Sequence, residues 1–171
     1  GSCYIDKNLK DQDIAIKDGK IIKIGKIDSE AKETFDAEGL TVLPGCIDTQ
    51  THFREPGSTD TEDLHSGSRA AIVGGITSVF EMPNTNPPTS TKVEFQKKLD
   101  LAKNRMYCNY AFYFGATADN ANELADLVNL EGCCGIKLFA GSSTGNLLVA
   151  EEEDIEKVFQ SSSKVVAVHS E

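Results

Sequence analysis

The chain has 171 residues, with 17 Lys or Arg against 27 Asp or Glu and a formal net charge of −10. This acidic balance argues against a nucleic acid or an anionic membrane as partner, because both require a face rich in Lys and Arg. No apolar stretch approaches the roughly 20 residues of a membrane span. We therefore expect a cytoplasmic protein of one domain, or of one small domain and part of another, without nucleic-acid or membrane partners.

The cysteines are odd in number and form no Cys-x-x-Cys pair: Cys3, Cys46, Cys108, Cys133 and Cys134. This pattern fits neither a disulfide framework nor a zinc knuckle. We interpret them as reduced thiols that act as small apolar side chains.

Residues 1–44 are predicted to form the N-terminal part of a small β domain. The alternating runs 13–16 and 20–24 flank Asp18-Gly19, a strong signal for a β-hairpin. A further short strand is predicted at 40–43, and it ends before Pro44-Gly45. No histidine occurs in this part of the chain, so we expect no catalytic residue there.

Residues 45–171 alternate between apolar strand patterns and helical patterns. Strands are predicted from residue 46 and at 76–80, 108–114, 135–139 and 164–169, with helices at 62–73, 91–103, 120–130 and 151–159. Such alternation is typical of parallel βα units whose sheet is covered on both faces. An open doubly wound sheet and a truncated (β/α)8 barrel both fit this pattern.

Polar residues follow or occupy four of these strands near their C-terminal ends: His52 and Arg54, Asn84, Lys137, and His169. In α/β barrels this end of the strands forms the active site. Lys137 is the most unusual, because burying a lysine in an apolar strand is costly unless it is paired, modified or functional. The alternative is a lysine whose stem lies along an edge strand with its amine in water.

Four segments together resemble dihydroorotases of the amidohydrolase superfamily, and the resemblance extends from Cys3 over nearly the whole chain. They are Thr41-Val-Leu-Pro-Gly-Cys-Ile-Asp-Thr-Gln-Thr-His-Phe-Arg-Glu-Pro-Gly57, Gly74-Gly-Ile-Thr-Ser-Val-Phe-Glu-Met-Pro-Asn-Thr-Asn-Pro87, Gly135-Ile-Lys-Leu-Phe-Ala-Gly-Ser-Ser-Thr-Gly145 and Val165-Val-Ala-Val-His-Ser-Glu171. His-Phe-Arg-Glu-Pro-Gly is shared with allantoinases, whereas Met-Pro-Asn-Thr points more narrowly to dihydroorotase.

The resemblance implies an α/β fold: the first five βα units of a metal-dependent (β/α)8 TIM barrel, preceded by part of a small β-sandwich domain. It implies reversible cyclisation of N-carbamoyl-L-aspartate to dihydroorotate in de novo pyrimidine biosynthesis. His52 and His169 would bind Zn2+, and a carboxylated Lys137 would bridge two metals. Arg54 and Asn84 would hold the substrate carboxylate. The metals would polarise the ring carbonyl and supply a hydroxide at neutral pH.

Two features depart from the family pattern. Gln50 stands where the family has the first histidine of His-x-His, and an amide oxygen is a poor zinc ligand. We therefore expect one or two zinc ions per full-length subunit, in a weakened site. A full barrel needs about 250 residues, so the general-base Asp is expected beyond residue 171. The 171-residue chain alone is expected to be inactive, with an unmodified Lys137 and no metal pair.

Alternative functions remain open at this stage. One is a hydantoinase or an allantoinase. Another is a catalytically inactive dihydroorotase-like subunit with a structural role, for example beside aspartate transcarbamoylase. We expect a homo-oligomer that binds a small-molecule substrate. The third histidine, His65, falls within a predicted helix and is expected at the surface.

Overall fold

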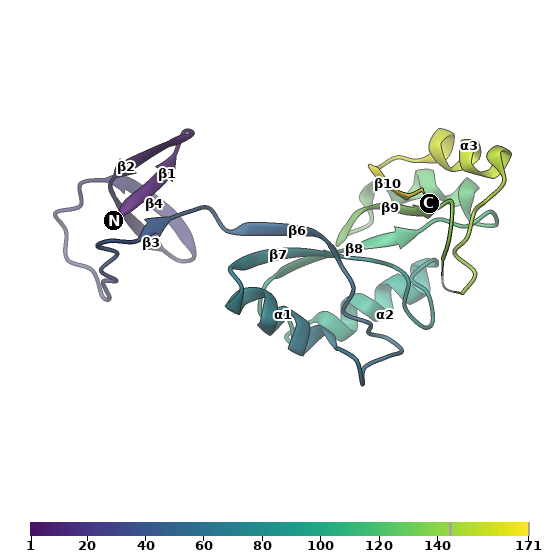
Figure 1. The fold of residues 1–171 in the computed structure, drawn as a ribbon, viewed down its shortest axis with the longest axis horizontal. Helices are drawn as coiled ribbons and strands as arrows, with labels where there is room; N and C mark the ends of the chain where they lie inside the picture. The colour runs from purple at the N-terminus through teal and green to yellow at the C-terminus, as the bar shows by residue number, and fades with distance from the viewer. Residues whose placement is uncertain (144, 171) are drawn as a thin grey trace. The chain divides into compact units, whose positions relative to one another are not determined.

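The structure is a computed structural model that describes residues 1–143 and 145–170. Thr144 and Glu171, which belong to two of the quoted motifs, lie outside the described residues. The chain divides into two compact units, Gly1–Gly45, which contains β1–β5, and Cys46–Glu171, which contains β6–β10 (Figure 1). Each unit is described by itself.

The first unit contains a three-stranded sheet and a separate β-hairpin. The sheet has the order β2-β1-β5 and consists of β1 (Ser2–Ile5), β2 (Asn8–Asp11) and β5 (Thr41–Val42). The hairpin joins β3 (Asp13–Lys17) to β4 (Lys20–Gly25), as predicted. Its turn residues Asp18 and Gly19 both have positive φ, 52° and 73°, which matches the twist of a two-residue hairpin.

The strands β1 and β2 were not predicted from the sequence. They are short, and the second is exposed along its whole length, so neither has a strong alternating pattern. Their tight turn places Asp6 and Lys7 at positive φ, 52° and 64°. Asp is a common turn residue, but Lys is not, and without a strong alternating pattern in the flanking strands this hairpin was not recognised from the sequence.

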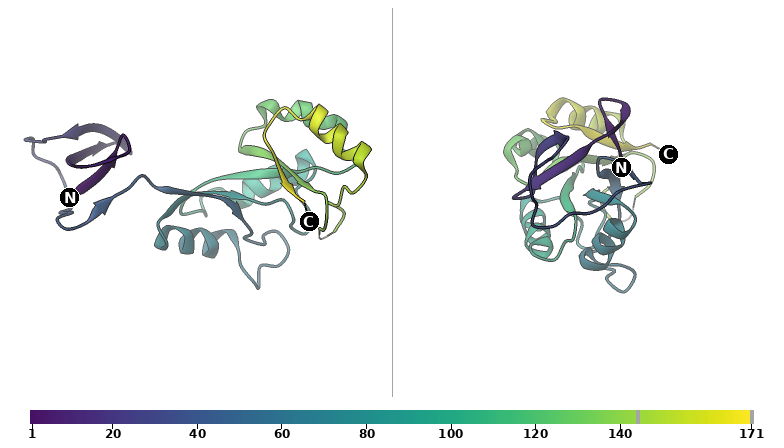
Figure 2. Two further views of the ribbon diagram at one scale, coloured as in Figure 1. Left: turned by 45° about the horizontal axis from the view of Figure 1, so that its top comes forward. Right: turned by 90° about the vertical axis from the view of Figure 1, so that its left-hand side faces the viewer.

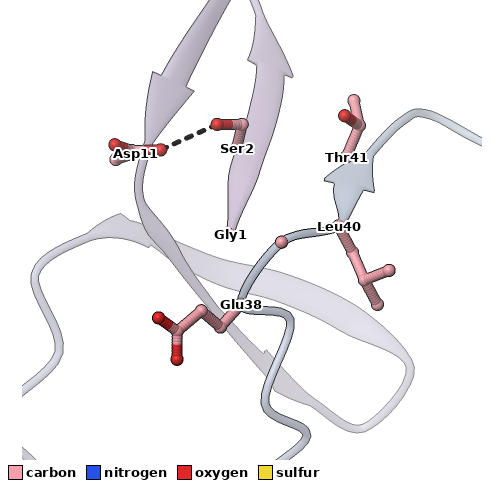
Figure 3. A pocket seen from close by; sticks show the side chains of 7 residues that line it. Gly1, Ser2, Asp11, Glu38, Leu40 and Thr41 are labelled. Atoms are coloured by element: carbon pink, nitrogen blue, oxygen red, sulfur yellow. Dashed lines mark hydrogen bonds between the residues drawn. The ribbon is translucent and has the colours of Figure 1, made fainter.

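A pocket of the first unit lies where the chain start meets β2 and the segment before β5 (Figure 3). Its lining includes Gly1, Ser2, Asp11 and Glu38, and the Ser2 hydroxyl donates to Asp11 Oδ1 at 2.8 Å. None of the predicted site residues lies in this pocket.

The second unit is a five-stranded parallel sheet in the order β10-β9-β8-β7-β6. Its strands are β6 (Cys46–Thr51), β7 (Ile76–Glu81), β8 (Asn109–Gly115), β9 (Cys133–Phe139) and β10 (Val166–His169). The spatial order equals the chain order. A doubly wound sheet reverses its order at a switch point, whereas a barrel does not. The second unit is therefore a half-barrel of the (β/α)8 type, as predicted.

The segments between the strands are α1 (Leu64–Val73), α2 (Lys92–Ala102), η1 (Ala121–Asn129) and α3 (Glu152–Ser161). Helices α1 and α2 pack below β7 and β8, and η1 and α3 lie side by side near β9 and β10 (Figures 1 and 2). Asp63 caps α1 by accepting from the Ser66 N–H at 2.6 Å, and Thr91 caps α2 in the same way.

The segment predicted as a helix at 120–130 is a 3-10 helix, η1. Its buried residues Ala121, Leu124 and Leu127 recur every third residue, which places them on one face of a 3-10 helix. Asn120 does not cap η1. It accepts from the Thr117 N–H at 2.8 Å and donates to two backbone carbonyls.

The core of the second unit lies between the sheet and these helices. Its largest buried apolar residues include Phe95, Phe112, Phe114, Leu124 and Leu138, all fully excluded from solvent. The cysteines are all free thiols. Within the described chain no helix is long and apolar enough to cross a membrane.

Candidate functional site

The predicted site residues lie toward the C-terminal end of the parallel sheet. His52 follows β6 directly, and Asn84 lies in the loop after β7. Lys137 lies two residues before the end of β9, and His169 is the last residue of β10. Because the strands are parallel and adjacent, their C-terminal ends form one edge, which in barrels carries the active site.

His52 and Asn84 are in direct contact. His52 Nδ1 lies 2.9 Å from Asn84 Oδ1, so the ring donates through Nδ1–H and leaves Nε2 as the nitrogen with a lone pair. Burial lowers the pKa of His52, and the charges of Arg54 and Lys137 lower it further. The imidazole is therefore held neutral and oriented, which is the state in which histidine binds a metal.

Lys137 is buried without a carboxylate partner. It is 3% exposed, and no ion pair joins it to an acidic side chain of the described chain. Its Nζ lies 5.1 Å from the centroid of the Phe139 ring. Burial lowers the pKa of Lys137, which favours the neutral amine. This excludes the alternative of a lysine that reaches water from an edge strand.

His169 lies beside Phe139, and the Phe139 ring lies beside Lys137. The two residues are paired in the register of β9 and β10, and their ring centroids are 5.8 Å apart. The Phe139 ring thus contacts both His169 and Lys137. His52, in turn, is within electrostatic reach of Lys137. The structure therefore brings these three side chains to one region of the sheet edge.

Gln50 is exposed near the end of β6, and its backbone N–H donates to Asp48 Oδ1 at 3.0 Å. In the part of the chain that the structure describes, no three His, Cys, Asp or Glu side chains come together as a metal-binding group.

The loop that carries Arg54 is fixed by a buried acid. Glu55 accepts two hydrogen bonds from Arg105, at 2.7 and 3.1 Å, and one from the Leu64 N–H at 2.9 Å. Arg54 itself is exposed and has a positive φ of 61°. The guanidinium is therefore presented to solvent next to His52 on a backbone that Glu55 holds in place.

This loop also touches the loop that carries Asn84. The Asn86 N–H donates to the Pro56 carbonyl at 2.9 Å, and Gly57 packs directly on Asn86. A Cβ at Gly57 would lie 2.8 Å from Asn86 Cβ and 3.0 Å from its backbone N and O. The distance between Arg54 and Asn84 is therefore set by close packing of the two loops.

A buried ion pair that was not predicted from the sequence joins β7 to α2. Glu81, the last residue of β7, pairs with Lys98 of α2, and each side chain is 1% exposed. Lys98 Nζ also donates to the Met82 carbonyl at 3.1 Å. Burial raises the pKa of Glu81 to about 7, against the lowering effect of Lys98, and burial lowers the pKa of Lys98. The available signal was a lysine on the buried face of a predicted helix, three residues after Phe95.

His65 lies on the surface of α1, where its Nε2 is 3.2 Å from the Tyr107 hydroxyl. The two rings meet edge to face, with centroids 5.1 Å apart. This exposed pair joins α1 to the segment before β8 and is not part of the strand-end group.

Comparisons with known proteins find dihydroorotases and allantoinases among the relatives of this chain. The chain is 40% identical over 151 residues to a dihydroorotase of Methanosarcina acetivorans, covering 87% of the chain and 32% of that protein. It is 38% identical over 143 residues to an allantoinase of Escherichia coli, covering 83% of the chain and 31% of that protein. The chain thus spans about a third of the length of the curated relatives it matches.

A solved structure supports the fold assignment. The L-hydantoinase (dihydropyrimidinase) of Arthrobacter aurescens superimposes with a TM-score of 0.88 at 30% identity, covering 98% of the chain and 39% of that protein. Residues 41–168, which contain all the predicted site residues except His169, match the Amidohydrolase family. The chain belongs to the amidohydrolase family.

Proposed function

We propose that the whole protein is a dihydroorotase, which interconverts N-carbamoyl-L-aspartate and dihydroorotate in pyrimidine biosynthesis. The observation that carries this proposal is the contact between His52 and Asn84, with the exposed Arg54 next to His52 in sequence. A cation and an amide beside the oriented imidazole favour a substrate that bears a carboxylate. Dihydroorotate has a ring carboxylate, whereas allantoin and unsubstituted hydantoin do not.

In this proposal the residues of the chain have distinct tasks. His52 through Nε2, His169 and a carboxylated Lys137 would hold zinc, with Gln50 as a weak fourth ligand. When bound, zinc would supply Lewis-acid polarisation of the ring carbonyl. Asn84 orients His52 with its oxygen, and its NH2 group can donate to the substrate carboxylate together with Arg54.

The surroundings of Lys137 support its carboxylation. Burial lowers the pKa of Lys137, and the neutral Nζ amine would attack CO2, forming an N–C bond and releasing one proton to water. The product would be a carbamate anion with two oxygen donors for a metal. We expect the modification to be stable only when a metal neutralises its charge.

The whole protein should hydrolyse dihydroorotate, and cyclise carbamoyl-aspartate, with a higher kcat/KM than it shows for hydantoin or allantoin. The measurement is a steady-state assay of all four compounds, with metal analysis of the same preparation. The similarity to an L-hydantoinase structure makes hydantoin the second candidate. A preference for hydantoin or allantoin would contradict the proposal, and the absence of turnover with all four would favour a structural subunit.

Arg54→Ala should raise the KM for carbamoyl-aspartate, because a charge-assisted contact to the carboxylate is lost. Such a contact contributes about 1.5–3 kcal/mol, or roughly 10- to 150-fold in binding. The matched control is Lys103→Ala, which removes an exposed cation at the C-terminal end of α2. Equal KM values for the two variants would refute the role of Arg54.

A further inference from the structure

The ion pair between Glu81 and Lys98 has an unusual place in the second unit. Both side chains are 1% exposed, and they connect the end of β7 to the middle of α2. Replacing a buried ion pair by apolar side chains of similar size is often neutral or stabilising. Stability of the fold alone is therefore a weak explanation for two charges at this depth.

The pair contacts the backbone on the β7 side of the site. Lys98 Nζ donates to the Met82 carbonyl at 3.1 Å, and the Met82 N–H donates to the Thr51 carbonyl at 2.9 Å. Both backbone polar groups of Met82, its N–H and its carbonyl, are thus held, two residues before Asn84. The exit direction of the loop after β7 is fixed at this point.

The same pair contacts the β6 side. Glu81 and Thr51 are paired in the register of β6 and β7. The backbone N–H of Phe53, between the two site residues His52 and Arg54, lowers the pKa of the Glu81 carboxyl, although burial outweighs this effect. The carboxylate thus lies within electrostatic reach of the chain where it leaves β6.

We propose that the Glu81–Lys98 pair positions the site, by fixing the ends of β6 and β7 from which the loops with His52, Arg54 and Asn84 emerge. Lys98 satisfies the Met82 carbonyl and Glu81 attracts the Phe53 N–H, which apolar side chains could not do. Neither residue touches substrate in this assignment. The positioning itself follows from the contacts described, and only its effect on turnover rests on the proposed function.

The test uses the whole protein with the double variant Glu81→Leu/Lys98→Met, which replaces the pair by apolar groups of similar size. The control is Glu94→Gln/Lys97→Met, which removes an exposed ion pair of 2.7 Å from the same helix. The readouts are hydrogen exchange at the Phe53 amide, the NMR signals of the His52 imidazole, and kcat and KM for dihydroorotate.

In the apolar double variant we expect exchange at Phe53 to accelerate by at least about tenfold, because the carboxylate that attracts the Phe53 N–H is lost. The His52 Nδ1–H signal should shift or broaden as its contact with Asn84 loosens, and KM should rise while kcat falls. The control should match the unaltered protein in all three readouts.

The double variant Glu81→Gln/Lys98→Met keeps one acceptor oxygen at position 81 and leaves no unpaired lysine in the core. It should give an intermediate exchange rate at Phe53 and recover most of the activity. This variant also tests the proposal if Glu81→Leu/Lys98→Met does not fold. Exchange at Phe53 equal to that of the unaltered protein would then overturn the proposal. Unchanged Phe53 exchange and His52 signals in a folded apolar double variant would overturn it as well.

The test distinguishes failure of the positioning role from failure of the proposed function. Exchange at Phe53 and the His52 signals report on the loops whether or not dihydroorotate is the substrate. Absence of dihydroorotate turnover in the unaltered protein would reject the proposed function, with the positioning role still measured by these two readouts.

Discussion

Replacing Lys137 by methionine should abolish metal retention and turnover in the whole protein while leaving the fold intact. Methionine keeps the length and apolar stem of the side chain but has no amine to be carboxylated. Because the described structure gives Lys137 no carboxylate partner, its charge is a cost to folding rather than a stabilising contact. The melting temperature of Lys137→Met should accordingly be unchanged or higher.

The measurements for Lys137→Met are zinc content, kcat/KM for dihydroorotate and a thermal melt. Loss of a group outside the ligand shell lowers metal affinity or activity by about 10- to 100-fold, so loss of a ligand should exceed that range. Lys103→Met is the control, since Lys103 is exposed. A Lys137→Met protein that keeps its zinc and its activity would show that Lys137 is not a ligand.

The variant Gly57→Ala should destabilise the second unit more than any substitution of an unhindered glycine. Gly57 has a φ of 121°, and an added Cβ would lie 2.8 Å from Asn86 Cβ. The unfavourable φ costs about 1–2 kcal/mol, and overpacking against Asn86 costs roughly 1–3 kcal/mol more. The added methyl group should also push the Asn84 loop away from Arg54 and raise the KM.

The matched control for Gly57→Ala is Gly75→Ala. Gly75 has a φ of 85°, but a Cβ there would have no neighbour within 4 Å. Only the cost of the unfavourable φ therefore remains. Urea unfolding of both variants measures the difference, and KM for dihydroorotate measures the effect on the loops. Equal losses of unfolding free energy in the two variants, with the same KM, would show that the contact between the loops affects neither stability nor substrate binding.

Local sequence patterns determined most of the secondary structure. The Asp18-Gly19 turn, the Thr91 cap and the alternation of apolar strands with helices each depend on residues close in the chain, so they can be recognised without the fold. The 3-10 form of η1 was not predicted, because Ala121, Leu124 and Leu127 fit an amphipathic α-helix nearly as well as a three-residue repeat. Packing in the tertiary structure determined which of the two helical forms η1 takes.

The sequence also placed His52, Asn84, Lys137 and His169 near the C-terminal ends of parallel strands. That inference needed only the positions of the strands and the rule that parallel strands share a direction. Lys137 was recognisable because a lysine in an apolar strand is costly to bury. Its burial in the structure agrees with this expectation.

Only the tertiary structure decided which side chains contact each other. The bond between His52 and Asn84 spans 32 residues, and the bond between Glu55 and Arg105 spans 50. Such contacts depend on strand order, register and the packing of α2 against the sheet, none of which a local pattern contains. The Glu81–Lys98 pair shows this most clearly. The local pattern places Lys98 on the buried face of a helix, but only the packing of α2 against the sheet brings it to Glu81 at the end of β7.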